Sequence, residues 1–196
     1  MLRSLILIVA LLCSSVVTAE SARPEDEVLG VSEAPPGGDF TLQSSKGDFL
    51  LTDLRGKVAL LYFGYTNCPD VCPTGLMFAA QAMNGLTEEE MQKVQTVFIS
   101  VDPKRDTYDV LDEYVEYFHP NMIGVTGSDD SVAKAASLYG VKYYEVDLQD
   151  SYFGYAVNHS AVTYLINPRG ELRFMFPHKT PSPVITEAIR YTLADQ

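Results

Sequence analysis

The fold of this chain is decided by the stretch VALLYFGYTNCPDVCPTGL, residues 58–76. Its first part, residues 58–63, is an unbroken apolar run, which is typical of a β-strand buried on both faces of a sheet. A turn with two cysteines follows, and the apolar spacing after it predicts a helix with Pro73 at its first position. This order places the turn at the carboxyl end of a strand, where open α/β sheets bind their ligands.

Strand and helix patterns alternate along the rest of the chain. Short apolar segments at 40–42 and 49–51 flank a turn-rich gap and predict an N-terminal hairpin. The last two strands, residues 161–166 and 172–176, are joined by a four-residue turn and should pair antiparallel. We therefore expect an α/β protein with a thioredoxin-like fold, in which a central mixed sheet is flanked by helices. The other expected elements are strands at 97–101, 122–126 and 141–146 and helices from residue 73 and at 106–118, 128–138 and 183–193.

The composition is that of a compact, acidic protein. With 196 residues, of which 46% are hydrophobic and 20% charged, the chain can bury the core of one domain, which excludes disordered and collagen-like proteins. It holds 14 Lys and Arg against 26 Asp and Glu, a net charge of −12. Because an acidic surface repels phosphate backbones, we expect no nucleic-acid partner. Proline and glycine at 20–38 predict a flexible linker, so the folded domain is expected at 39–196.

Residues 1–19 have the composition of a secretory signal peptide. Arg3 precedes an apolar run at 5–12, and the small residues at 17–19 follow, which predicts cleavage near residue 19. The alternative is an uncleaved segment that associates with the membrane, although it is shorter than the ~20 residues of a spanning helix. We therefore expect an exported protein of the periplasm, either free or attached to the outer face of the inner membrane.

Cleavage would remove Cys13 and leave two cysteines, Cys68 and Cys72. A structural disulfide between them would stabilise the fold little, because so short a loop loses little entropy on closure. A thiol at a helix N-terminus is favoured as a thiolate, and the spacing allows either a redox-active disulfide or two bonds to copper(I), zinc or iron–sulfur. Each cysteine precedes a proline, which disfavours α geometry. We therefore expect a tight turn, not a regular helix, between the sulfurs.

Three histidines could complete a metal site. His159 lies just before the strand expected at 161–166, whose start should lie beside the cysteine turn, so His159 is the candidate third ligand; a hydrogen-bonded structural histidine is the alternative. His119 is expected to end a helix, where histidine suits the helix dipole. His178 is expected to be exposed.

The residues quoted above resemble the Sco family, also called SenC or PrrC. Residues 62–73 are similar to the family signature YFGYTxCPDVCP without a mismatch, and residues 100–107, SVDPKRDT, are similar to a second family block. The resemblance implies a thioredoxin-like domain that binds copper through Cys68, Cys72 and His159. It also implies that the client is the binuclear copper centre in subunit II of cytochrome c oxidase, or another copper-accepting protein.

One position departs from the family pattern. The family commonly has aspartate directly before the histidine, whereas this chain has Asn158. An amide cannot supply the negative charge that orients and strengthens a metal-bound imidazole, so this residue bears on copper(II) affinity and on the client. Asp70 could compensate from within the turn, although its expected role is to hydrogen-bond to the backbone.

Two functions fit these residues. The first is a copper metallochaperone and thiol-redox assembly factor for cytochrome c oxidase that holds copper(I) and copper(II), and such a protein is not an enzyme in the sense of turnover. The second is a periplasmic thiol–disulfide oxidoreductase that uses Cys68 and Cys72 as its redox-active pair without a metal. His159 distinguishes them, because a dithiol exchanger does not need it. A thiol peroxidase is disfavoured because residues 62–73 hold no Arg or Lys.

Overall fold

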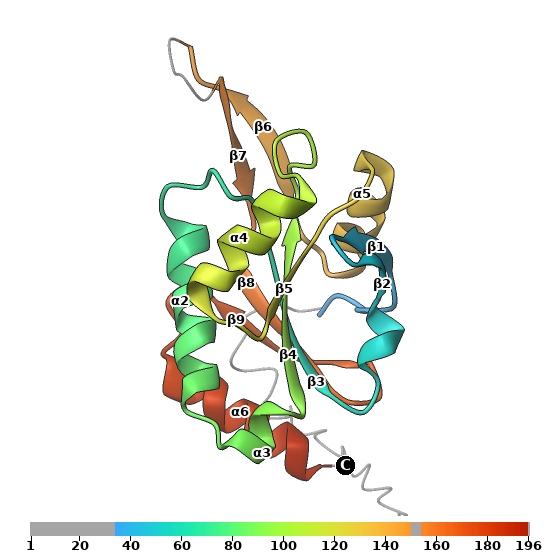
Figure 1. Ribbon diagram of the computed structural model, residues 1–196, viewed down its shortest axis with the longest axis vertical. Helices are drawn as coiled ribbons and strands as arrows, with labels where there is room; N and C mark the ends of the chain where they lie inside the picture. Colours follow the sequence, from blue (N-terminus) through green and yellow to red (C-terminus); the bar gives the residue numbers. More distant parts are fainter. Residues whose placement is uncertain (1–33, 150–153, 196) are drawn as a thin grey trace, which may run out of the picture.

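A five-stranded mixed sheet forms the centre of the computed structural model, which describes residues 34–149 and 154–195 (Figure 1). β3 pairs in parallel with β4 and antiparallel with β8, so the sheet changes direction beside its central strand. The expected mixed sheet and thioredoxin-like fold are confirmed. From edge to edge, the strands are β5 (Met122–Val125), β4 (Val94–Ser100), β3 (Val58–Gly64), β8 (Val162–Ile166) and β9 (Leu172–Pro177).

Helices cover both faces of this sheet (Figure 1). One face packs against α2 (Val71–Asn84), α4 (Tyr108–Phe118) and α6 (Ser182–Ala194). The other face packs against α5 (Asp129–Leu138) and the expected N-terminal hairpin, formed by β1 (Thr41–Ser44) and β2 (Gly47–Leu50). Two short helices complete the domain, η1 (Leu51–Leu54) and α3 (Glu88–Met91).

β3 is buried at all 7 of its positions, as its apolar run predicts. Leu60 packs in one apolar cluster with Ile185 of α6. The ring of Phe63 points to the other face and lies 5.9 Å, between centroids, from the ring of Tyr139, which follows α5. β3 is packed on both faces, so its carboxyl end is a rigid support for the loop that follows. We call this loop, residues 65–70 between β3 and α2, the cysteine loop.

The pairing of β3 with β8 decides what lies beside that loop. Tyr62 near the end of β3 is paired with Thr163 near the start of β8. Two antiparallel strands in this register bring the chain that enters β8 next to the chain that leaves β3. The segment that carries His159 therefore approaches the cysteine loop, as the sequence predicts.

A hairpin that the sequence analysis did not predict, formed by β6 (Tyr143–Asp147) and β7 (Tyr155–His159), projects from the domain (Figure 1). The prediction was one strand at 141–146 with His159 in a connection. His159 instead ends β7, paired with Tyr143 of β6. β6 overlaps the predicted strand, so the strand that was missed is β7, which is short and has only Val157 fully buried and therefore gives a weak apolar pattern in the sequence.

The N-terminal predictions lie largely outside the described residues. This holds for the predicted signal peptide, residues 1–19, and for residues 20–33 of the predicted linker. At the end of that linker, the Gly37 N–H donates to the Leu138 carbonyl at 3.0 Å and the Tyr139 hydroxyl donates to the Gly38 carbonyl at 2.9 Å, so these two glycines contact the domain. Within residues 34–149 and 154–195, no helix combines the length and apolar character needed to cross a membrane.

Gly124 in β5 provides a test of the packing between β5 and α4. A Cβ at this position would lie 2.7 Å from the Leu111 Cβ and 3.1 Å from the Leu111 backbone. We expect Gly124→Ala to lower the free energy of unfolding by about 1–3 kcal/mol, because the backbone of α4 must shift. Denaturant unfolding measures this, with Ser137→Ala on an exposed position of α5 as control. An unchanged unfolding midpoint would contradict the described packing.

Candidate metal centre

The Cys68 sulfur lies at the N-terminus of α2 and accepts hydrogen bonds from its backbone. The Cys72 N–H donates to Cys68 Sγ at 3.4 Å, and the Asp70 N–H also donates to this sulfur. Backbone donors at a helix start otherwise lack partners, so the sulfur serves as the helix cap. Asp70 is exposed and its side chain makes no capping hydrogen bond, so the backbone role expected for this carboxylate is wrong.

Cys72 lies in the first turn of α2, which begins at Val71. The expectation that both cysteines avoid α geometry is therefore wrong for Cys72, and the turn is confined to the residues before it. Pro73 fits in this first turn because its missing N–H would have no helical partner there. The helix thereby buries the Cys72 thiol completely, at 0% exposure.

Gly64 explains why the signature has glycine at the end of β3. A Cβ at this position would lie 2.7 Å from Cys72 Sγ and 2.9 Å from the Phe98 ring. Glycine therefore leaves the space that the Cys72 sulfur occupies. The Tyr62 hydroxyl donates to the Val71 carbonyl at 3.0 Å and fastens the first turn of α2 to β3.

Asp106 holds the cysteine loop against the carboxyl end of β4. Its carboxylate accepts hydrogen bonds from the Thr66 N–H at 3.0 Å, from the Thr66 hydroxyl at 2.6 Å and from the Ser100 hydroxyl. The side chain is fully buried, and this burial raises the pKa of Asp106. The cap of α4 is the next residue, Thr107, whose hydroxyl accepts from the Val110 N–H.

His159 comes together with both cysteines, although 87 positions separate it from Cys72. Its Nε2 atom lies 3.0 Å from Cys72 Sγ. One ligand atom from each of Cys68, Cys72 and His159 lies within 4.8 Å of the other two. The rings of Tyr62 and Tyr65 meet the imidazole edge to face, at centroid distances of 6.3 and 5.9 Å, and limit how it can turn.

The other ring nitrogen of His159 contacts a carbonyl oxygen. Nδ1 lies 3.1 Å from the Ser160 carbonyl, which can only accept a hydrogen bond, so Nδ1 carries the proton. In the neutral imidazole, Nε2 then presents its lone pair to the cysteines, which is the state that binds a metal ion. A backbone carbonyl thus orients the ring, as partners of metal-bound histidines commonly do.

Asn158 points away from this site. Successive side chains on a strand face opposite sides, and the Asn158 amide donates to the Tyr144 hydroxyl at 2.8 Å across the hairpin. The residue that departs from the family pattern therefore makes no contact with the imidazole. Its effect on copper(II) binding, expected from the sequence, has no contact to act through.

The other two histidines lie outside the cluster. His119 follows α4, as expected, and its Nδ1 accepts from the Asn121 N–H at 3.0 Å. Burial lowers the pKa of His119. His178 is half-buried in a crevice that Phe78 and Thr163 also line, so the expectation that it is exposed is wrong. Lys179 and Thr180, in the turn that leads to α6, line the same crevice.

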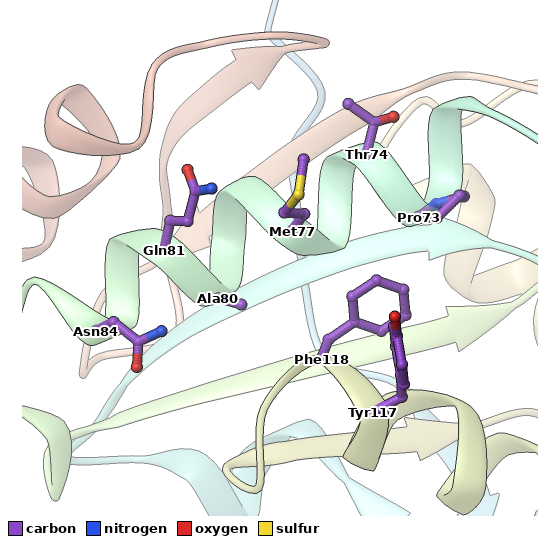
Figure 2. A pocket seen from close by; sticks show the side chains of 8 residues that line it. All are labelled: Pro73, Thr74, Met77, Ala80, Gln81, Asn84, Tyr117 and Phe118. Atoms are coloured by element: carbon purple, nitrogen blue, oxygen red, sulfur yellow. The ribbon is translucent and has the colours of Figure 1, made fainter.

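A groove between α2 and α4 has a volume of about 470 Å³ (Figure 2). Met77 of α2 and Tyr117 of α4, with exposed fractions of 45% and 85%, are its most exposed apolar residues. It begins at Pro73, directly after Cys72, but contains none of the three clustered side chains. The complete lining is Pro73, Thr74, Met77, Ala80, Gln81, Asn84, Tyr117 and Phe118.

Comparison with known proteins agrees with this geometry. A family model described as SCO1/SenC matches residues 31–194. The chain belongs to the SCO1/SenC family. Among relatives, the mouse protein named Protein SCO2 homolog, mitochondrial, is 38% identical over 178 residues, which cover 89% of this chain and 69% of that protein.

Solved structures of Sco proteins share the fold. The crystal structure of Arabidopsis thaliana ScoI with copper bound has a TM-score of 0.75 and 37% identity and covers 82% of this chain and 99% of that one. The structure of Bradyrhizobium japonicum ScoI with copper bound has a TM-score of 0.73 and 33% identity, with coverage of 81% and 99%. The fold and family expected from residues 62–73 are therefore confirmed.

Sequence reasoning missed the residues that support the clustered side chains. The block at 100–107 was noted only for its likeness to the Sco family, whereas its two aspartates, Asp102 and Asp106, are 2% and 0% exposed. The available indication was their position: the loop after β4 must lie beside the loop after the parallel strand β3. Carboxylates that are this buried need nearby donors, and Thr66 and Ser100 supply them to Asp106.

The two thiols differ in acidity. Hydrogen bonding from the Cys72 side chain is the largest cause that lowers the pKa of Cys68, to about 3, and it acts against the effect of burial. Burial raises the pKa of Cys72, and the adjacent Cys68 sulfur raises it further. At neutral pH the reduced site therefore holds one thiolate and one thiol.

Ultraviolet absorbance near 240 nm measures this difference. We expect reduced, metal-free protein to show about one thiolate between about pH 5 and pH 8, because the pKa of Cys68 lies below this window and that of Cys72 above it. The thiolate of Cys68 is lost only as the pH falls towards 3. Cys68→Ser should lack the absorbance, and two thiols that titrate together near the usual cysteine pKa would contradict the assignment.

Proposed function

We propose that this protein binds one copper ion through Cys68 Sγ, Cys72 Sγ and His159 Nε2 and delivers it to a copper-accepting protein during cytochrome c oxidase assembly. The observation that carries the proposal is the convergence of two sulfurs and one imidazole nitrogen within 4.8 Å of one another. The copper-bound structures of its relatives support the choice of metal.

The chemistry of the three side chains suits copper(I). Sulfur and imidazole nitrogen are soft enough to select it over hard cations. Bonds of ~2.3 Å to one ion would place three ligand atoms in a plane about 4 Å apart, compared with the 4.8 Å limit of the cluster. The ion would replace the Cys72 thiol proton and widen the 3.0 Å contact between Cys72 and His159. Binding therefore releases about one proton at neutral pH.

Three ligands leave copper(I) open to a fourth. A client cysteine or histidine could add to the ion before a protein ligand leaves, so the metal passes by ligand exchange. We propose the binuclear copper centre in subunit II of cytochrome c oxidase as the acceptor. Oxidation of Cys68 and Cys72 to a disulfide would remove two ligands at once, which couples copper transfer to the redox state of the pair.

The alternative function, a metal-free thiol–disulfide oxidoreductase, is less well supported. Its low pKa suits Cys68 for attack on a disulfide, but the sulfur belongs to a residue only 8% exposed and the imidazole of His159 has no part in such a reaction. Rapid reduction of insulin disulfides by metal-free protein would favour this alternative.

The location proposed is the periplasm, after export by residues 1–19. This segment lies outside the described residues, so the proposal rests on its sequence: one arginine, an apolar run and small residues before the expected cleavage point. If cleavage does not occur, the same segment would attach the domain to the outer face of the inner membrane.

Titration with copper(I) against a chromophoric chelator tests the three ligands. We expect reduced wild-type protein to bind one ion, Cys68→Ser and Cys72→Ser to lose tight binding, and His159→Ala to bind about 100-fold more weakly, because each change removes a ligand. His119→Ala is the matched control, since His119 lies outside the cluster, and should leave the affinity unchanged. An unchanged affinity in His159→Ala would contradict the three-ligand site.

Asn158→Asp tests the role of the residue before the histidine. We expect this variant to change the copper(II) affinity by less than about threefold, because the side chain faces Tyr144 and an exposed charge is screened by solvent. Tyr144→Phe, which removes the hydrogen-bond partner, is the companion variant. A tenfold or greater increase for Asn158→Asp would show that an acidic side chain here reaches the metal.

A further inference from the structure

The loop between β4 and α4, residues 101–107, contacts both segments that carry the proposed copper ligands. Towards its end, Asp106 binds Thr66 of the cysteine loop. Near its start, the Asp102 carboxylate accepts a hydrogen bond from the Tyr155 hydroxyl at 2.7 Å, and Tyr155 begins β7. One short loop thus joins the cysteine loop to the hairpin that ends in His159.

Arg105 completes the contact with β7. Its Nε donates to the Asp102 carboxylate and its Nη1 donates to the Tyr155 carbonyl at 2.8 Å. The guanidinium also lies over the Tyr155 ring, 3.7 Å from its centroid, where a cation is attracted to the π-system. We call Asp102, Arg105 and Tyr155 the hairpin clamp.

The hairpin clamp joins a largely buried ion pair of the domain to this hairpin. The side chains of Asp102 and Arg105 are 1% and 20% exposed. By contrast, the ion pair between Lys104 and Glu145 of β6 is 58% and 50% exposed, and exposed pairs contribute little. Charge-assisted hydrogen bonds in a buried setting are stronger, so the clamp holds β7 more firmly than the exposed pair holds β6.

Arg105 also contacts the Tyr65 ring, which packs against the imidazole of His159. Its guanidinium lies 5.6 Å from the centroid of the Tyr65 ring, and that ring meets His159 edge to face at 5.9 Å. Arg105 therefore supports His159 by two routes, along β7 through Tyr155 and through the face of Tyr65.

We infer that the hairpin clamp is a positioning device that fixes His159 against the cysteines and thereby sets the preference of the site for copper(II) relative to copper(I). The inference rests on the proposed function. None of the three clamp residues belongs to the ligand cluster, so each acts through His159. Two sulfurs satisfy much of the coordination of copper(I), whereas copper(II) favours nitrogen donors in a fixed geometry. Loosening the histidine therefore costs copper(II) more.

Arg105→Lys and Tyr155→Phe test the clamp. Lysine keeps the charge but not the forked, planar contact, and phenylalanine keeps the ring but not the hydroxyl bond to Asp102. Anaerobic titrations, followed by the copper(II)–thiolate absorption band and by chelator competition for copper(I), should show a loss of about tenfold or more in copper(II) affinity for Arg105→Lys. Tyr155→Phe should show a smaller loss. Copper(I) affinity should change less than about threefold, and Glu145→Gln, which weakens the exposed pair without removing a group that lies on the Tyr155 ring, should change neither affinity.

A double-mutant cycle separates positioning from a general structural effect. If Arg105 acts through His159, Arg105→Lys should cause no further loss of copper(II) affinity in a His159→Ala background. Equal losses of copper(I) and copper(II) affinity, or the same further loss in the His159→Ala background, would overturn the clamp.

The clamp and the proposed function fail in different ways. Wild-type protein that binds no copper, or His159→Ala that binds it as well as wild type, would overturn the proposed function. Wild-type and His159→Ala proteins that behave as proposed, with Arg105→Lys and Tyr155→Phe indistinguishable from wild type, would overturn the clamp alone.

Discussion

One contact between distant parts of the chain governs the site: His159 Nε2 lies 3.0 Å from Cys72 Sγ. It exists because β8 runs antiparallel to β3, so that the chain entering one strand meets the chain leaving the other. Neither segment alone offers three soft ligands. The site therefore depends on the centre of the sheet, where β3 is buried along its whole length.

Local patterns in the sequence predicted the features that depend on neighbouring residues. The apolar run at 58–63 predicted a buried strand, and the cysteine spacing predicted reactive thiols at a helix N-terminus. The β6–β7 hairpin was missed because its second strand, β7, is short and has only one fully buried residue, so it leaves a weak apolar pattern in the sequence. Burial of Asp102 and Asp106 was also missed, because partners far along the chain stabilise those carboxylates. Once His159 is known to end a strand, alternation alone turns Asn158 away.

The two cysteines have unequal environments, and this inequality suits a carrier. Cys68 caps α2 and receives backbone hydrogen bonds, which favour its thiolate. Cys72 lies beneath Gly64 with its thiol kept protonated by burial. Copper would first bind the Cys68 thiolate and then displace the thiol proton of Cys72. Return of a proton to Cys72 would favour release of the ion. The loop at 101–107 hydrogen-bonds to the segments that carry these groups, through Asp106 to Thr66 and through Arg105 to the Tyr155 carbonyl.

X-ray absorption spectroscopy of the copper(I)-loaded protein tests the three-ligand site most directly. The expected spectrum has two sulfur atoms and one imidazole nitrogen around each copper ion, at distances typical of thiolate and histidine ligands. His159→Ala should lose the nitrogen contribution while both sulfurs remain. A wild-type spectrum with sulfur ligands alone, or one that His159→Ala leaves unchanged, would contradict the convergence of these three side chains on one metal ion.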